Sequence, residues 1–345
     1  MSDTRGMSID LLSPAIVALL PVLVFLAALL LLDSYKLVRP SAVIAALVSG
    51  VVATGASYLA GALVLGHFDV GVAAFSRYVA PVSEELFKGL VIIVLVRAHR
   101  IGFLVDAAVF GFAIGSGFAL VENLYYLHLA PDAGMATWIV RGFGTALMHG
   151  GVTAVFAVMG VAVIERSPRA GLSAFLPGFA LAVVLHSAFN HLNHSPRLAM
   201  LLTLVTLPPL MALIFQRSER VLGNWLGRGF DADATMLELI NSGRFPDSPP
   251  GRYLQGLKQT FAGPLVADTL CYLRLYTELS LRAKGLLMMR ENGFETPELD
   301  DETRSRLAEM RHLERTIGAT VLRTLRPLLR MRRKELWQIN MLESG

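Results

Sequence analysis

Residues 81–88 read P-V-S-E-E-L-F-K and open an apolar run that continues to Val96. Glu84, Glu85 and Lys88 therefore lie at the edge of, or inside, a segment apolar enough to enter a membrane. An uncompensated charge there costs about 2.5–3.5 kcal/mol on insertion scales. On a helix, Lys88 lies four residues from Glu84 and three from Glu85, so either carboxylate can pair with it. The stretch predicts one neutralised Glu–Lys pair and a second, desolvated carboxylate that can accept a proton.

The composition of the whole chain agrees with a membrane location. Of its 345 residues, 54% are apolar and 17% are charged, which is typical of a protein with several membrane spans. The 31 Lys and Arg residues exceed the 27 Asp and Glu residues only slightly. We therefore expect the lipid bilayer as a partner and no nucleic acid. The single Cys271 excludes a cysteine-rich metal site.

Seven apolar runs of about the length that crosses a bilayer follow one another. They cover residues 11–32, 41–65, 79–96, 103–127, 138–164, 172–191 and 198–215. These runs predict an all-α fold: a polytopic helix bundle of about seven spans over residues 1–215. From Gln216 onward, 20 basic and 17 acidic residues predict a helical domain over 216–345. Its two long helices should form a hairpin, with the second starting at Thr296-Pro297-Glu298.

The charges of the loops predict the orientation. Basic residues follow the first, third, fifth and seventh runs, while the alternate loops are poor in them. Since Lys and Arg mark the cytoplasmic side, the N-terminus should lie outside and the 216–345 domain in the cytoplasm. We expect a multi-pass protein of the cell's inner (cytoplasmic) membrane.

Four spans carry polar side chains that lipid would reject. Besides the glutamates and lysine of the third span, these are Glu122 and Asn123, Arg141 and His149, and His186 and Asn190. Counted along antiparallel spans at about 1.5 Å per residue, Glu84, Glu122 and His186 each lie five residues, roughly 8 Å, below the outer end. A common depth in antiparallel helices predicts a single site. Arg141 is expected to extend outward to the membrane surface.

Two histidines and a carboxylate from separate helices can form an open zinc site. The predicted ligands are Glu122, His149 and His186. Three protein ligands leave a fourth position for water. No H-E-x-x-H pattern, the usual signature of soluble zinc proteases, is present. The same side chains can also work without metal, with glutamate as base and histidine as donor to an oxyanion.

The remaining polar groups of the predicted site have catalytic roles. Either Glu84 or Glu85 fits the base that takes a proton from water as it attacks a carbonyl, and we expect Glu85 and His186 to be the most sensitive to mutation. Asn190 can orient a ligand or hold an oxyanion. Lys88 should neutralise one of the two glutamates.

Two other classes of function remain open at this point. Carboxylates, lysine and histidine inside a bundle also serve proton-coupled transporters and channels, although no inverted repeat is visible. A polar core can also fix helix pairing in a membrane scaffold, whose working part would then be the cytoplasmic hairpin.

Four motifs on separate spans make the chain resemble the PrsW family of intramembrane proteases, within the wider group of CAAX-prenyl endopeptidases. They are Glu84-Glu85-x-x-Lys88, Phe118-x-x-x-Glu122-Asn123, His149, and His186-x-x-x-Asn190, all within residues 79–191. The wider group tends to have histidine where Glu122 stands and arginine near the position of Lys88. The glutamate and lysine therefore favour the PrsW branch.

The resemblance implies an intramembrane endopeptidase that cleaves membrane-anchored protein substrates near the outer face. In the family's best-known role the substrate is an anti-sigma factor, so the resemblance also implies regulated proteolysis in signalling. The family is usually described as metalloproteases, whereas its wider group includes glutamate proteases. The resemblance implies nothing about residues 216–345.

Overall fold

The computed structural model describes residues 12–259, 261–325 and 333–343. Within these residues all regular structure is helical and no strand is present, which confirms the predicted all-α class. The chain forms two units. The first contains the described residues up to Asp33 and Leu37–Ser218, and the second contains Ser34–Lys36 and the described residues from Glu219 onward.

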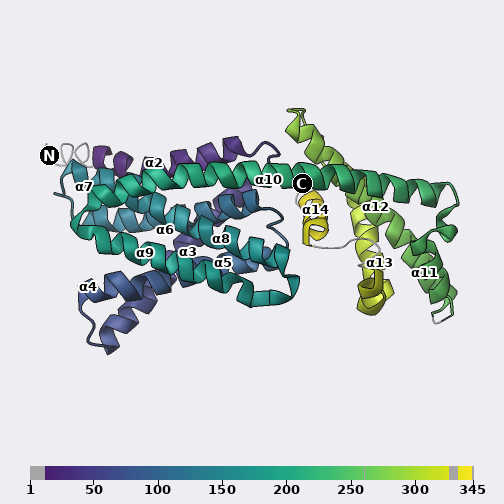
Figure 1. Ribbon diagram of the computed structural model, residues 1–345, viewed down its shortest axis with the longest axis horizontal. Helices are drawn as coiled ribbons and strands as arrows, with labels where there is room; N and C mark the ends of the chain where they lie inside the picture. The colour runs from purple at the N-terminus through teal and green to yellow at the C-terminus, as the bar shows by residue number, and fades with distance from the viewer. Residues whose placement is uncertain (1–11, 260, 326–332, 344–345) are drawn as a thin grey trace, which may run out of the picture. The chain divides into compact units, whose positions relative to one another are not determined.

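The first unit is a bundle of membrane-length helices, which run alongside one another in Figure 1. In lipid a helix satisfies all its backbone hydrogen bonds internally, so long apolar runs fold this way. The elements are α2 (Leu12–Leu32), α3 (Pro40–His67), α4 (Val72–Ala74), η1 (Phe75–Val79), α5 (Ala80–Arg97), α6 (Leu104–Leu129), α7 (Met135–Val140), η2 (Arg141–Ala146), α8 (Leu147–Arg166), η3 (Pro168–Phe175), α9 (Leu176–His191), η4 (Leu192–His194) and α10 (Pro196–Asn241).

Six helices in the described part of the chain are long and apolar enough to cross a membrane. The sequence predicted seven. The difference is α5, which is helical over Ala80–Arg97 but carries the charged side chains of residues 81–88, so its composition sets it apart from the other six. A helix with this many charges needs neighbours that compensate them inside the bundle.

Helix α6 lies at the centre of the bundle. In its most apolar 18-residue stretch 83% of the residues are buried, the largest share among the six spans. Helix α8 packs along it. A Cβ added at Gly111 would lie only 2.7 Å from Ala154 Cα, and one added at Gly115 would collide with the backbone at His149. The small residues of Gly111-x-x-x-Gly115 therefore allow the two backbones to approach closely, which brings the helix of Glu122 against that of His149.

Two π-helical turns precede the helices that carry the polar residues. Segment η1 leads into α5, and η2 leads into α8. Wide turns of this kind are uncommon and occur frequently at functional sites. Residues 70–79 form the end of a loop followed by α4 and η1, continuous with α5.

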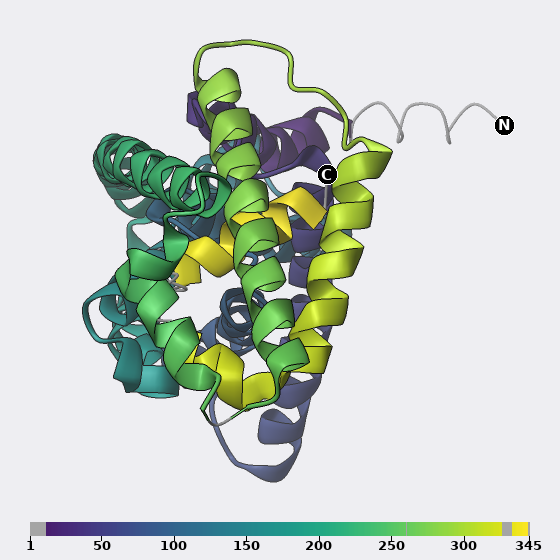
Figure 2. The ribbon, with the colours of Figure 1, turned by 90° about the vertical axis from the view of Figure 1, so that its right-hand side faces the viewer.

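The second unit contains a helical hairpin and shorter helices. Its elements beyond α10 are η5 (Phe245–Asp247), α11 (Pro249–Leu257), α12 (Gly263–Glu291), α13 (Asp301–Leu325) and α14 (Arg333–Glu343). Figure 2 shows α12 and α13 side by side, joined by the loop over residues 292–300. Ion pairs of Glu278 with Arg306 and of Arg282 with Asp300 fix their antiparallel register.

The second helix of the hairpin starts later than predicted. Residues 296–300 are not helical, and α13 begins at Asp301. The carboxylate of Asp300 accepts a hydrogen bond from the backbone N–H of Thr303 at 2.8 Å. An aspartate in this position is a better N-cap than threonine, so the helix begins after Asp300 and the predicted start at Thr296 is wrong.

Candidate active site

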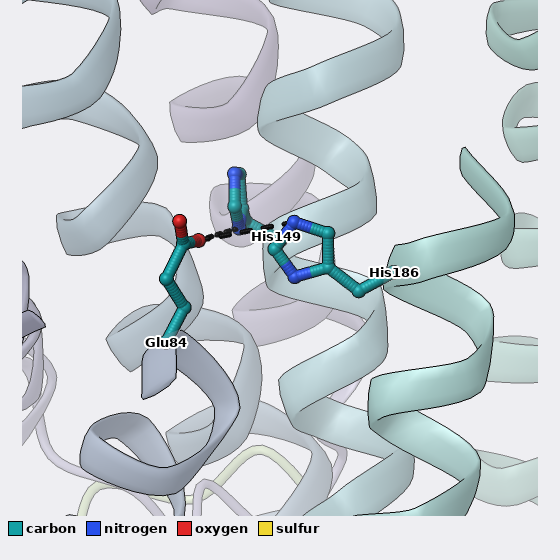
Figure 3. Close-up of side chains that lie close together, drawn as sticks. All are labelled: Glu84, His149 and His186. Carbon is teal, nitrogen blue, oxygen red and sulfur yellow. Dashed lines mark ion pairs between the residues drawn. The ribbon is translucent and has the colours of Figure 1, made fainter. Parts of the chain in front are cut away.

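The polar side chains of four membrane helices meet at one place in the first unit. Glu84, Glu85 and Lys88 come from α5, Glu122 from α6, His149 from α8 and His186 from α9. Figure 3 shows Glu84, His149 and His186 pointing toward one another from separate helices. The contacts below join these six side chains into a single cluster.

Lys88 pairs with Glu85. Its Nζ lies 2.6 Å from Glu85 Oε1, and the two side chains are 0% and 1% exposed. Nζ also lies 4.6 Å from the centre of the Phe118 ring. A buried ammonium without a partner would be strongly destabilising, so this pair is the neutralised one. Glu84 is the remaining carboxylate of α5.

His149 bonds to a different partner through each ring nitrogen. Its Nδ1 lies 3.2 Å from Lys88 Nζ, and its Nε2 lies 2.7 Å from Glu122 Oε2. An ammonium can only donate, and a carboxylate can only accept. These partners assign the proton to Nε2, which donates to Glu122, and leave a lone pair on Nδ1.

His186 is held in the same way by the other glutamate. Its Nδ1 lies 2.8 Å from Glu85 Oε1, so Nδ1 carries the proton and Nε2 keeps a lone pair. The two imidazole rings are 4.9 Å apart at an interplanar angle of 89°. Each ring therefore bonds a carboxylate through its protonated nitrogen and keeps a second, unprotonated nitrogen, here called bare, which in His149 accepts a hydrogen bond from Lys88.

Glu84 faces those bare nitrogens. Its Oε2 lies 4.0 Å from His149 Nδ1 and 3.8 Å from His186 Nε2. This oxygen is buried and accepts no hydrogen bond from the residues that the structure describes. One ligand atom from each of the three residues lies within 4.8 Å of the others, against about 3.3 Å between the ligands of a tetrahedral zinc ion. The donor set and the unpartnered oxygen therefore fit a metal ion after small inward movements.

The model of one protein family matches residues 34–214, which is just over half of the 345-residue chain. The chain belongs to the PrsW family of intramembrane metalloproteases. No curated protein and no solved structure matches it. The match contains every side chain of the cluster, whereas α2 and the part of the second unit from Glu219 onward lie outside it.

Membership of the PrsW family makes this chain an intramembrane metalloprotease and a multi-span membrane protein. The resemblance inferred from the four motifs is thereby confirmed. The family implies a metal ion and membrane-protein substrates, and it separates the chain from the transporter and scaffold alternatives. The buried group of Glu84, His149 and His186 could hold that metal.

The group that could hold the metal of this PrsW-family enzyme contains Glu84 where the sequence predicted Glu122. Both oxygens of Glu122 have partners in the structure: Oε1 lies 3.1 Å from Arg141 Nη2, and Oε2 faces His149. The choice between the two glutamates depends on contacts from other helices, which the sequence does not reveal.

Asn190 bonds to the backbone of η1. Its Nδ2 donates to the carbonyl of Ser76 at 2.8 Å, and the neighbouring Ser187 donates to the carbonyl of Arg77 at 2.6 Å. Both contacts tie α9 to η1, the turn that leads into α5. In this arrangement Asn190 fastens the turn that leads into the helix of the two adjacent glutamates.

Arg141 lies elsewhere than the sequence predicted. Its side chain was expected to extend outward, but it is only 14% exposed and lies 3.9 Å over the Tyr126 ring. The signal that could have identified it is the pair Glu122-Asn123 on the neighbouring span, which offers an acidic and an amide partner at the same depth.

Proposed function

We propose that this chain is a zinc endopeptidase that hydrolyses membrane-anchored protein substrates near the outer face of the bilayer. Glu84 Oε2, His149 Nδ1 and His186 Nε2 would hold the metal. The observation that carries the proposal is the buried, unpartnered oxygen of Glu84 facing two imidazole nitrogens that carry lone pairs. Nitrogen and carboxylate oxygen are the ligands of catalytic zinc, and three of them leave one position open.

The neighbouring carboxylates have the role of orienting the ligands. Glu122 accepts from His149 Nε2 and Glu85 accepts from His186 Nδ1. Outer carboxylates of this kind fix the tautomer and the direction of a metal-binding histidine. Lys88 neutralises Glu85. Lys88 Nζ also contacts His149 Nδ1, and this distance has to lengthen before that nitrogen binds metal.

A zinc ion bound there would act as a Lewis acid: it would polarise the scissile carbonyl and make a water molecule more acidic. Within the chain, we assign the proton transfer to Glu84. Its Oε1 takes a proton from the attacking water and later returns it to the leaving amine. Glu85 is less suited to this step because its Oε1 already accepts hydrogen bonds from both Lys88 and His186.

The tautomers argue against the metal-free alternative. A histidine that stabilises an oxyanion must present an N–H. In the structure, the nitrogens of both rings that carry the proton point toward carboxylates, and the nitrogens that face Glu84 are bare. The arrangement supports metal binding over a glutamate-only mechanism.

The orientation and biological role belong to the same proposal. The loop charges support an external N-terminus and a cytoplasmic location for residues 216–345, in a protein of the cell's inner membrane. Reporter fusions after Arg39, after Asp132 and at Gly345 should read inside, outside and inside. An external C-terminal unit would contradict this orientation. Cleavage of a signalling protein such as an anti-sigma factor is the role that the resemblance suggests.

The decisive experiment uses the full chain in liposomes with a quenched-fluorescent peptide that spans the membrane once. Wild-type protein should hold about one zinc ion per chain, lose cleavage with a strong chelator and regain it with added zinc. His186→Ala should lose both the zinc and the cleavage. His194→Ala, at an exposed histidine just beyond α9, is the matched control and should behave as wild type. Metal-free protein that cleaves at the wild-type rate would disprove the zinc mechanism.

A further inference from the structure

Arg141 holds two consecutive side chains of α6. It stands at the first position of η2, directly before α8. Its Nη2 lies 3.1 Å from Glu122 Oε1, and its Nε donates to Asn123 Oδ1 at 2.9 Å. The guanidinium carbon lies 3.9 Å from the centre of the Tyr126 ring. The side chain therefore makes one hydrogen bond, to Asn123, one ion pair, with Glu122, and one ring contact, with Tyr126.

Glu122 connects this arginine to the active site. One carboxylate oxygen faces Arg141, while the other accepts from His149 Nε2 at 2.7 Å. The direction of the His149 ring therefore depends on where Arg141 holds the carboxylate. The geometry points to Arg141 as a positioning residue of the protease, which acts through Glu122 to keep the bare Nδ1 of His149 turned toward Glu84. This inference rests on the proposed function, in which His149 Nδ1 binds the metal.

The first span supports this arrangement from behind. Asn123 Nδ2 donates to the carbonyl of Ala18 in α2 at 2.7 Å, and Ala18 is fully buried. Gly142, next to Arg141, packs so closely on α2 that an added Cβ would collide with the carbonyl of Val17. Helix α2 lies outside the family match at residues 34–214. It adds the start of a path of hydrogen bonds and one ion pair that runs from Ala18 through Asn123, Arg141 and Glu122 to His149.

Lysine cannot replace arginine here. The guanidinium is a rigid planar fork that serves two acceptors at once and stacks on a ring, whereas an ammonium is a compact point charge on a flexible stem. Arg141→Lys should keep the attraction to Glu122 and lose the simultaneous bond to Asn123. We expect it to recover part of the activity that Arg141→Gln loses.

A double-mutant cycle tests the inference. Arg141→Gln should lower kcat by about 10- to 100-fold, as loss of a group that orients a metal ligand does, with KM changed less than about two-fold. In a Glu122→Gln background, Arg141→Gln should lower kcat by less than about two-fold, because no carboxylate remains at position 122 for Arg141 to position. Arg166→Gln, at the exposed far end of α8, is the charge-matched control. Equal factors in both backgrounds, or an effect confined to KM, would overturn the positioning role.

A spectroscopic measurement follows the ring itself. In metal-free protein labelled with 15N-histidine, the His149 resonances should show a protonated Nε2 and an unprotonated Nδ1, because Lys88 donates to Nδ1 and Glu122 accepts from Nε2. Arg141→Gln leaves both partners in place, so it should keep this tautomer but shift the Nε2 resonance as the hydrogen bond to Glu122 loses its fixed direction. An unchanged Nε2 resonance together with a lowered kcat would contradict the inference. If Arg141→Gln does not fold, the Arg141→Gln/Glu122→Gln double variant is used, because it carries no unpaired charge at this place. The ratio of its kcat to that of Glu122→Gln gives the effect of Arg141→Gln in that background.

Different results would disprove the proposed function and the positioning role of Arg141. If His149→Ala cleaves as wild type does, the proposed function is wrong whatever Arg141 does. If His149→Ala is inactive while Arg141→Gln matches wild type in kcat, only the positioning role is wrong.

Discussion

The chain buries one lysine in each of its two units, and the comparison separates structure from function. Lys88 in the membrane unit and Lys284 in the C-terminal unit are 0% and 2% exposed, and each lies 2.6 Å from a carboxylate oxygen. Each also lies near an aromatic ring, Phe118 at 4.6 Å and Trp225 at 5.0 Å. A buried ion pair is therefore a means of compensation that both units use, and it does not by itself indicate a catalytic site.

The surroundings of the two pairs differ. Lys284 donates to Asp233 and Ser280, and Ser280 in turn donates to Asp233, so these three polar groups satisfy one another. Beside Lys88 there is a further carboxylate, Glu84, which has a buried oxygen that accepts no hydrogen bond from the described part of the chain. The surplus acidic group next to bare imidazole nitrogens is what makes the membrane cluster chemically capable.

The largest expected effect is that of removing the surplus charge. Glu84→Gln should lower kcat by about 10³- to 10⁴-fold, since the amide cannot take a proton from water, while thermal stability stays at the wild-type value or rises. Asp233→Asn should do the reverse, destabilising the C-terminal unit and leaving cleavage intact. Peptide cleavage and thermal unfolding of both variants provide the measurements. Substantial activity in Glu84→Gln would remove the distinction between the two clusters.

The next effect concerns the lysines. Lys88→Met and Lys284→Met each leave a carboxylate without its buried partner, so each should cost about 3–5 kcal/mol of stability. Only Lys88→Met should also impair cleavage in the protein that remains folded, because Glu85 then no longer holds His186 in place. Denaturant unfolding followed separately for each unit, with activity per folded molecule, tests this. Equal losses of activity in the two variants would contradict the comparison.

A smaller effect is expected at Asn190, which the sequence predicted to be catalytic. Its hydrogen bond to the carbonyl of Ser76 suggests a cost of about 1 kcal/mol for Asn190→Ala. The loss in kcat should stay below the 10²-fold or more that removal of an oxyanion donor causes. Steady-state kinetics distinguish the two roles, and a loss as large as that of Glu84→Gln would restore Asn190 to the catalytic group.

The smallest effect lies in the exposed part of the hairpin. Hydrogen bonds from the side chain and backbone of Thr303 lower the pKa of Asp300 from 3.8 to about 2. A lowered pKa in the folded state contributes stability above the unfolded pKa and loses it as the pH falls toward 2. Asp300→Ala should therefore be slightly less stable than wild type at neutral pH, and the gap should close between about pH 4 and pH 2. Thermal unfolding at several pH values checks this, and a gap independent of pH would exclude a role for the charge.

Much of the molecule could be predicted because it depends on local sequence. The apolar runs determine the membrane helices, since a segment of that length and composition has to satisfy its own backbone in lipid. The motifs of Glu84, Glu122, His149 and His186 identify the family and the residues of the cluster. The count of spans differed only at α5, where the same charges that mark the site lower the hydropathy of the helix.

The roles inside the cluster required the tertiary structure. Lys88 can reach Glu84 or Glu85 along its own helix, and it pairs with Glu85, which also accepts from His186, 101 residues away. Glu122 and Glu84 are equivalent as carboxylates in the sequence. In the structure Arg141 and His149 contact Glu122, whereas Glu84 Oε2 accepts no hydrogen bond from the described residues. Residue type and helical spacing determine which groups can meet. Which of them compensate one another and which stays available is decided by neighbours on other helices, because burial makes every charge depend on whatever partner lies within reach.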